Sequence, residues 1–431
     1  MAPTMSVQSG CDAIHWDVIV VGAGPAGAAL ACRLRPRYRV LVMERAKLSS
    51  QQTPSAPGKG LSCQGAPAIG ESLPGAAQTL LLRLGIAEQF LADGHVERTA
   101  MVASWDSPMP VWFDPLRDPS GPGWHLDRRR FDESLRAAAI AAGAVVQERC
   151  GRLDVGRWEG QWQLRSQGLG QVQRAPVLID ASGRSGSVAR CLGLSRRQED
   201  ALICLYIHLP ADANDQDRCT RLCADDNGWW YSVRLPCGQR VLAFHLDGHD
   251  PELNPLRHGP ALLAKALRQP LLAEVLPVAA GFDQGAVRQL PVYGRPAGTA
   301  TLAWAALAAM EGFYAVGDAA IAFDPIASQG LFHALASSEG VANAVDRHFA
   351  GQAQPQAAYL AELDAVYSRY RIHLQAAYAG PQRFSSHPFW ASRLAPGSIA
   401  MAHRLQGDQT LGQQSRWVRG HNELIAPLSL A

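Results

Sequence analysis

The chain has 431 residues, of which 47% are hydrophobic and 18% are charged, and its formal net charge is +2 at neutral pH. This length allows two or three lobes with a large core, and the balanced charge gives no argument for binding to nucleic acid or to a membrane surface. No run of about 18 apolar residues occurs that could cross a bilayer. Residues 1–14 lack the apolar core of a signal peptide, so we expect a disordered leader on a cytoplasmic protein.

Nine cysteines, an odd number, are scattered along the chain. Cys219 and Cys223 are four residues apart, but neither a CxxC pair nor a histidine lies at metal-ligand spacing. We therefore expect reduced thiols, with neither disulfides nor a metal site.

The first element in chain order is a short apolar run followed by a glycine-rich turn. Residues 17–21 predict a buried strand, and the sequence Gly-Ala-Gly-Pro-Ala-Gly that follows leads into a helix. Gly22 permits the tight turn, Gly24 lets a pyrophosphate approach the backbone, and Gly27, after Ala26, lets helix and strand pack closely. The helix N-terminus then presents unpaired N–H groups and a positive dipole end to the phosphates.

A second apolar run, residues 38–43, ends in Glu44 and Arg45. Binding of a ribose hydroxyl pair requires an acidic residue about 20 positions beyond the first glycine, which is where Glu44 stands. A lone GxGxxG would be weak evidence in a chain with 40 glycines. Its place between a strand and a helix, with Glu44 downstream, favours a bound dinucleotide.

The next part of the chain contains a small strand insertion near residues 95–125, where apolar and polar residues alternate. A helix is expected to follow, with Arg128 near its beginning. Residues 177–180 predict another buried strand, which ends in Asp180 and is followed by Gly183. This repeats the pattern of a strand that ends in an acid and a glycine.

From residue 201 to residue 298 the pattern changes to period-two alternation with Pro/Gly turns, which predicts a separate, largely antiparallel lobe. Residues 313–318 return to the buried-strand pattern and end in Gly317 and Asp318. A helix is expected to begin near Gly330.

Three separated strand ends therefore point at one ligand, and this favours FAD bound along its whole length over a nicotinamide cofactor. The expected fold class is α/β, with a Rossmann-like FAD-binding domain, an inserted antiparallel substrate lobe and a C-terminal helical segment. The corresponding ranges are 15–200 and 299–350 for the FAD-binding domain, 201–298 for the substrate lobe and 351–431 for the helical segment.

The motifs at residues 22–27, 44–45, 180–184 and 317–320 resemble those of flavoprotein monooxygenases of the p-hydroxybenzoate hydroxylase fold. Their order and spacing cover nearly the whole chain up to about residue 350. The resemblance implies that the ends of these strands, Asp180 and Gly183 included, contact the cofactor.

Residues 70–74, 126–132, 228–232 and 323–330 resemble the tryptophan-halogenase-like branch of this fold. Within that branch they are similar to the flavoproteins of tryptophylquinone biogenesis, such as the monooxygenase that serves quinohemoprotein amine dehydrogenase. The resemblance implies hydroxylation of a tryptophan in a partner polypeptide, a quinoprotein subunit precursor, through a flavin hydroperoxide. It also implies O2 as co-substrate and NAD(P)H or a separate reductase as the electron source.

The residue types predict roles around the flavin. Asp318 would accept hydrogen bonds from the ribityl hydroxyls, and Arg128 would pair with a phosphate or the flavin edge unless it is simply a surface arginine. The helix near Gly330 would aim its N-terminus at the ring and stabilise the anionic reduced flavin. Pro325 and Gly330 would shape the loop that passes the ring, and Gln329 in that loop is a further expected contact.

The chemistry also needs a dry pocket and a group that takes up a ring proton. Trp229, Trp230 and Tyr231 could wall the pocket, with core packing as the alternative for each. One of the two adjacent tryptophans must face away from the other, so they cannot both line the pocket. Three residues are candidate acids or bases by residue type, with a structural role as the alternative for each histidine: Glu71, His208 and His245.

Lysine usage argues against halogenation. In the halogenases a pocket lysine some tens of residues after the Gly-Glu element receives the hypochlorite. Here the three lysines are Lys47, Lys59 and Lys265, and the corresponding segment, residues 96–101, contains none.

Three other functions stay open. An FAD-dependent reductase of the geranylgeranyl reductase type shares this fold and several motifs. A hydroxylase of a small indole or other aromatic would use the same chemistry without a protein partner. A flavin-binding assembly factor would hold FAD without catalysis.

Overall fold

The computed structural model describes residues 13–48, 68–69, 72–114, 118–210, 215–276 and 289–394. Glu71, most of the expected leader and the end of the expected C-terminal segment lie outside these ranges.

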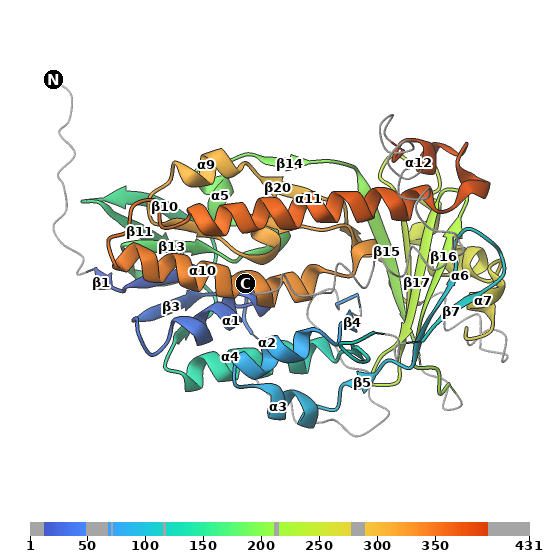
Figure 1. Cartoon of the computed structure of the whole chain (residues 1–431), viewed down its shortest axis with the longest axis horizontal. Coiled ribbons are helices and arrows are strands. Elements are labelled where there is room, and N and C mark those ends of the chain that lie inside the picture. Colours follow the sequence, from blue (N-terminus) through green and yellow to red (C-terminus); the bar gives the residue numbers. More distant parts are fainter. Residues whose placement is uncertain are drawn as a thin grey trace.

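A five-stranded parallel sheet forms the centre of the first lobe (Figure 1). Its strands, in spatial order, are β21 (Phe313–Ala315), β13 (Val177–Asp180), β2 (Val18–Val21), β3 (Val40–Met43) and β9 (Val145–Gln147). Strands β13, β2 and β3 are buried along their whole length, because a parallel sheet covered on both faces has no solvent-facing side.

Helices cover this sheet. Helix α1 (Pro25–Leu34) packs against α4 (Arg128–Ala141) and α10 (Gly330–Phe349). Helix α11 (Ala357–Ala379), the long orange-red helix in Figure 1, packs against α10 and extends toward the second lobe.

A seven-stranded sheet forms the second lobe. Its strands, in spatial order, are β19 (Tyr293–Pro296), β15 (Leu202–Leu209), β18 (Arg240–Asp247), β17 (Gly228–Arg234), β16 (Cys219–Asp225), β6 (Ala100–Ser104) and β7 (Val111–Phe113). All neighbours pair antiparallel except β16 and β6, which are parallel. Strands β6 and β7 come from the insertion near 95–125 and complete this sheet, outside the parallel sheet of the first lobe. The expected α/β class, with a separate and largely antiparallel lobe, is confirmed.

The two faces of the seven-stranded sheet belong to different cores. Trp229 packs into the large core that continues into the first lobe, whereas Trp230 packs under helices α6 (Gly259–Ala266) and α7 (Pro270–Ala273). The prediction that the two adjacent tryptophans face opposite sides is confirmed.

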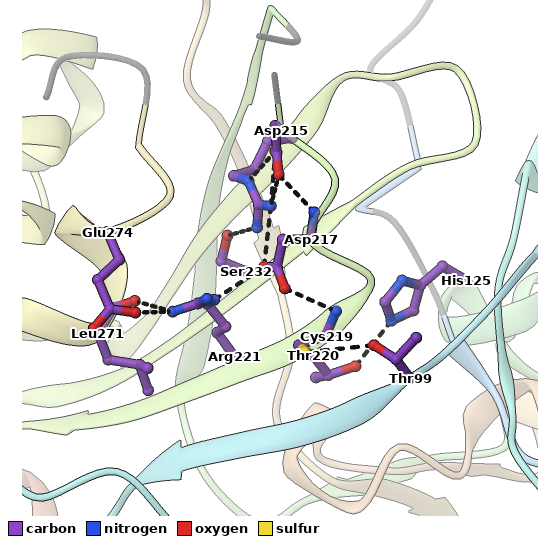
Figure 2. A network of polar contacts seen from close by, with 11 residues as sticks. Thr99, His125, Asp215, Asp217, Cys219, Thr220, Arg221, Ser232, Leu271 and Glu274 are labelled. Carbon is purple, nitrogen blue, oxygen red and sulfur yellow. Dashed lines mark hydrogen bonds and ion pairs between the residues drawn. The ribbon is translucent and has the colours of Figure 1, made fainter. Parts of the chain in front are cut away.

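A buried polar network fastens the segment that enters β16 (Figure 2). The Arg240 guanidinium, with 1% of its side chain exposed, lies 2.7 Å from Asp215 Oδ2 and 3.2 Å from Asp217 Oδ2. Arg221 pairs with Asp217 at 2.9 Å and with Glu274, at the end of α7, at 2.7 Å. The network therefore links β18, β16 and α7 through charge pairs.

The remaining elements are short. Two further sheets contain β1 (Ile14–His15), β12 (Leu169–Ala175), β11 (Gln161–Ser166) and β10 (Leu153–Trp158), and β14 (Arg196–Gln198), β20 (Ala300–Leu302) and β22 (Ile321–Ala322). A third contains β4 (Ser72–Leu73), β8 (Trp124–His125) and β5 (Val96–Glu97). The other helices are α2 (Ala77–Arg83), α3 (Ala87–Ala92), α5 (Ser187–Cys191), α9 (Trp304–Ala308) and α12 (Pro388–Ala391), with 3-10 turns η2 (Gly183–Ser185), η3 (Pro255–Arg257), η5 (Gly317–Ala319), η6 (Pro325–Ala327) and η7 (Gln382–Phe384).

Within the ranges that the structure describes, no helix is long and apolar enough to span a bilayer. The same ranges contain no group of three or more His, Cys, Asp or Glu side chains that could hold a metal ion.

Candidate active site

A cavity of about 1100 Å³ lies where the two lobes meet. It brings together most of the residues that the sequence singles out. From the first lobe these are Gly22, Gly24, Ala26, Glu44, Arg45, Arg128, Gly183, Asp318, Pro325, Gln329 and Gly330, and from the second lobe Trp229, Tyr231 and His245.

The glycine turn between β2 and α1 forms one end of the cavity. Gly22 has φ +114°, and a Cβ there would lie 2.3 Å from the carbonyl oxygen of Ala181. A Cβ on Gly27 would lie 2.0 Å from the carbonyl oxygen of Gly22, so this glycine serves the packing of helix on strand. A Cβ on Gly24 would meet no protein atom within 4 Å. The space beside Gly24 therefore belongs to the cavity, and a pyrophosphate group fits the cradle that a side chain would fill.

Glu44 is held in place at the same end. Its Oε2 accepts a hydrogen bond from the Ala23 N–H at 2.9 Å, and its Oε1 accepts one from the Ala46 N–H at 3.1 Å. These bonds fix the carboxylate beside the turn, in the position that a ribose hydroxyl pair requires.

Three expected cofactor residues, Gly27, Asp180 and Gly317, do not line the cavity. Asp180 is fully buried, and its carboxylate accepts hydrogen bonds from the Ser182 N–H and the Ala189 N–H, each at 2.9 Å. Its role is to shape the turn that carries Gly183 to the cavity wall. Gly317 has φ +60°, and a Cβ there would lie 2.8 Å from the Ala26 Cβ, so it permits the close approach of η5 to α1.

Asp318 faces the cavity between two arginines that the sequence did not single out as site residues. Its Oδ2 lies 3.7 Å from Arg184 Nε, and its backbone carbonyl accepts a 2.8 Å hydrogen bond from Arg196 Nη2. Burial among protein atoms raises the pKa of the Asp318 carboxyl group, while Arg184, Arg196 and Arg128 oppose the rise. No motif marks Arg196, because the pairing of β14 with β20 that brings it beside Asp318 is a tertiary feature.

Helix α10 begins at Gly330, as expected, and its first residues line the cavity. Gln329 precedes the helix, and its Nε2 is buried without a hydrogen-bond partner. No side chain caps this helix end. The free N–H groups, the Gln329 amide and the positive end of the helix dipole together suit a ligand with electron-rich oxygen or nitrogen atoms. Arg128, at the start of α4, lines the cavity and also pairs with Asp132 at 3.2 Å.

Trp229 and His245 line the cavity from the second lobe. They face each other on neighbouring strands, and their rings stack with centroids 3.6 Å apart and planes 6° apart. His245 is 2% exposed, and neither ring nitrogen has a hydrogen-bond partner. Burial lowers the pKa of His245 to about 3, so the imidazole is neutral near pH 7 and too weak a base to be matched to that pH.

Of the other two predicted acid or base residues, His208 and Glu71, only His208 lies within the described ranges. His208 has its Nε2 2.9 Å from the Ala68 carbonyl oxygen, does not line the cavity, and has a pKa lowered by burial. Glu71 lies outside the described residues. Tyr231 lines the cavity, and its hydroxyl lies 3.4 Å from Ser72 Oγ.

Sequence reasoning did not assign Asp324 or Tyr378. Asp324 lines the cavity, and its buried carboxylate accepts a 2.6 Å hydrogen bond from the Tyr378 hydroxyl of α11. The Tyr378 oxygen in turn accepts a 3.4 Å hydrogen bond from the indole Nε1 of Trp229. Asp324 lies in a motif that the sequence pointed out, whereas Tyr378 is 54 residues further along the chain and carries no local signal.

Lysine is absent from the described cavity wall. Lys265 lies on α6, on the opposite face of the seven-stranded sheet, and its Nζ is 2.8 Å from Glu252 Oε2. It is therefore held by charge pairs and kept apart from the cavity.

Comparisons with known proteins agree with this fold. No family model matches the chain. The FAD-dependent oxidoreductase LodB from Marinomonas mediterranea is 25% identical over 396 residues, which cover 90% of this chain and 99% of LodB. Digeranylgeranylglycerophospholipid reductase 1 from Methanopyrus kandleri is 28% identical over 196 residues, which cover 44% of this chain and 46% of the reductase.

Two solved structures share the architecture. The flavin-dependent halogenase CmlS superposes with a TM-score of 0.73 at 19% identity and covers 95% of this chain and 72% of its own. The peptidyl tryptophan dihydroxylase QhpG, essential for tryptophylquinone cofactor biogenesis, has a TM-score of 0.68 at 22% identity and covers 90% of this chain and 80% of its own. The chain thus has the fold of FAD-dependent halogenases and monooxygenases, and the expected enzyme class, a flavin-dependent oxidoreductase, is confirmed at that level.

Proposed function

We propose that this protein is an FAD-dependent monooxygenase that hydroxylates a tryptophan side chain of a partner polypeptide during biogenesis of a tryptophylquinone cofactor. One observation carries the proposal. A single cavity runs from the glycine turn to an aromatic wall that contains a neutral, unpartnered histidine and, within the described residues, no lysine. The likeness to QhpG supports the choice of substrate.

The cavity residues suit FAD from end to end. The turn at Gly24 and the N-terminus of α1 would take the pyrophosphate, Glu44 the ribose and Asp318 the ribityl chain. The N-terminus of α10 and the Gln329 amide would hold negative charge on the ring. When bound and reduced, FAD supplies the two electrons that activate O2 for transfer of an oxygen atom. Those electrons would come from NAD(P)H or a separate reductase.

The aromatic wall would receive the indole. A neutral imidazole has one donor and one acceptor nitrogen, so the unpartnered His245 can accept a hydrogen bond from an indole N–H. Trp229 holds the His245 ring by stacking and, with Phe323, excludes water from this end. His245 thereby positions the substrate and stays uncharged.

The absence of a lysine on the described cavity wall favours hydroxylation over halogenation. A lysine amine that carries the halogen is the feature that the tryptophan halogenases need. Oxygen transfer needs no such carrier.

The test is turnover of the FAD-loaded protein with a quinoprotein subunit precursor, O2 and a reductant, in buffer with chloride and bromide. We expect a tryptophan-containing fragment to gain the mass of one or two oxygen atoms and no halogen. Free indole in place of the precursor tests the small-aromatic alternative. A halogenated fragment, or an unmodified precursor while O2 is consumed, would contradict the proposal.

A second candidate is reduction of isoprenoid double bonds, which the match to the Methanopyrus reductase favours over about half of each chain. It predicts product formation without O2 and without a protein partner. Anaerobic turnover with a geranylgeranyl lipid separates the two candidates, and we expect no reduction there.

A further inference from the structure

We propose that Asp324, held by Tyr378, accepts the proton that leaves the substrate ring when oxygen is added, and that Tyr378 couples it to the Trp229 wall. The inference rests on the proposed hydroxylation and names its proton acceptor.

One buried carboxyl group is linked to the aromatic residues of the cavity. Asp324 is 1% exposed and lines the same cavity as Trp229 and His245. Its Oδ2 accepts the 2.6 Å bond from Tyr378, and the Tyr378 oxygen accepts the 3.4 Å bond from Trp229. A change of charge on Asp324 is therefore transmitted to the ring that stacks on His245.

A purely structural role of Asp324 would explain the hydrogen bond to only one of its two carboxylate oxygens. Asp324 precedes the turn η6, and its Oδ1 accepts the Ile326 N–H at 2.9 Å, which is an ordinary cap. An asparagine would cap equally well through its side-chain oxygen. The cap does not account for the buried Oδ2, which accepts a hydrogen bond from Tyr378, the residue that also bonds Trp229.

The surroundings of Asp324 raise the pKa of its carboxyl group toward neutral pH. Burial raises its pKa to about 6, Asp200 adds to the rise, and the bonds from Tyr378 and Ile326 and the charge of Arg393 oppose it. The other titratable groups nearby are uncharged or bind the backbone. His333 on α10 has a pKa lowered by burial to about 4, and Tyr370 on α11 binds the Asp324 N–H through its oxygen.

With Asp324 as the proton acceptor, the atoms, protons and electrons of the reaction balance. Addition of oxygen makes the reacting ring carbon tetrahedral, and loss of its proton to Asp324 returns the C–H electron pair to the ring. One oxygen of O2 becomes the hydroxyl group and the other leaves as water. The two electrons and one proton would come from FAD in its anionic reduced form. Asp324 returns its proton to that water, and one further proton comes from solvent.

The test compares Asp324→Asn and Tyr378→Phe with Tyr370→Phe as the matched control. Tyr370 lies on the same helix but bonds the Asp324 backbone, so it leaves the carboxylate alone. In substrate-free, FAD-loaded protein, infrared titration should show a carboxyl group near pH 6. We expect this signal to vanish in Asp324→Asn, to move to higher pH in Tyr378→Phe and to stay in place in Tyr370→Phe.

In turnover with the quinoprotein subunit precursor, the acidic limb of the pH–kcat profile should change as the infrared signal does. It should vanish in Asp324→Asn, move to higher pH in Tyr378→Phe and stay in place in Tyr370→Phe. Asp324→Asn should lower kcat about 100-fold with little change in KM, as expected for loss of a general base. Wild-type kcat or an unchanged acidic limb in Asp324→Asn overturns the assignment of Asp324, and an unmoved limb in Tyr378→Phe overturns the role of Tyr378. If the wild-type protein forms no oxygenated tryptophan, the proposed function falls and the assignment with it.

Discussion

Gly24 and Gly27 lie three residues apart in one motif, but a side chain would have different effects at the two positions. The backbone of Gly22 closes on Gly27 and leaves no room for a Cβ, whereas the space beside Gly24 is open. The motif encodes a local turn, so the sequence could predict the packing role of Gly27 and the open space beside Gly24. It could not predict that Asp180, in a similar strand-end motif, turns its carboxylate away from the cavity to bind backbone N–H groups.

We expect Gly24→Ala and Gly27→Ala to separate binding from folding. In Gly24→Ala the new methyl group meets no protein atom within 4 Å, so the free energy of unfolding of the apoprotein should change by less than about 1 kcal/mol while FAD affinity falls. In Gly27→Ala the methyl group meets the Gly22 carbonyl, so the apoprotein itself should be destabilised. Urea unfolding and flavin titration check both. Tight FAD binding by Gly24→Ala would contradict the assignment of the turn.

Asp324 allows a stability prediction with a definite sign. Its pKa is raised from 3.8 to about 6 in the folded state, so the folded protein prefers the protonated carboxyl group. The ionised group lowers stability increasingly as pH rises from 3.8 to 6, by up to about 3 kcal/mol. Asp324→Asn should therefore be more stable than wild type at pH 8, and the gain should shrink toward pH 4. Thermal unfolding across this range measures it, and a gain independent of pH would contradict the ionised state.

At the scale of elements, the ends of β2, β13 and β21 meet at one edge of the parallel sheet, as the three strand-end motifs predict. The contribution of β6 and β7 to the second lobe was not predictable in the same way. Strand β6 pairs in parallel with β16, far along the sequence, and no local pattern specifies such a partner. The same holds for Tyr378, which reaches the cavity only because α11 packs across the lobes.

The network of Arg240 lets us predict how strongly the second lobe depends on buried charge. In Arg240→Met, Asp215 and Asp217 lose a partner in a site where their side chains are 10% and 12% exposed. We expect a loss of about 3–5 kcal/mol in unfolding free energy, partly recovered by adding Asp215→Asn. Arg37→Met, which breaks an exposed pair with Asp346, is the control and should cost less than about 1 kcal/mol.

The loss should also depend on pH. Burial alone would raise the pKa of Asp217, but Arg221 and Arg240 hold it below its usual value of 3.8. The pairing therefore stabilises the fold above pH 3.8 and is lost as pH falls through the folded-state pKa. The gap between wild type and Arg240→Met should narrow below pH 3.8, and a constant gap would show that the arginine acts through packing alone.

At the scale of the whole molecule, both lobes line one cavity, and each lobe contributes different residues to it. The first lobe supplies the turn at Gly24 and the carboxylate of Glu44. The second lobe supplies Trp229 and His245, and α11 ties it to the first through the bond from Tyr378 to Asp324. Sequence motifs predict the part of the cavity around Gly24 and Glu44, because local turns form it. The part of the cavity where we propose that the substrate reacts is assembled from distant segments, which local sequence patterns do not bring together.

The most direct test of the central claim is a single turnover of the FAD-loaded, reduced protein with oxygen-18 gas and a quinoprotein subunit precursor. We predict that oxygen-18 appears on a tryptophan side chain of the precursor, and that ordinary O2 in oxygen-18 water leaves that side chain unlabelled. A label taken from water, or a precursor without added oxygen after the flavin has been reoxidised, would contradict the account.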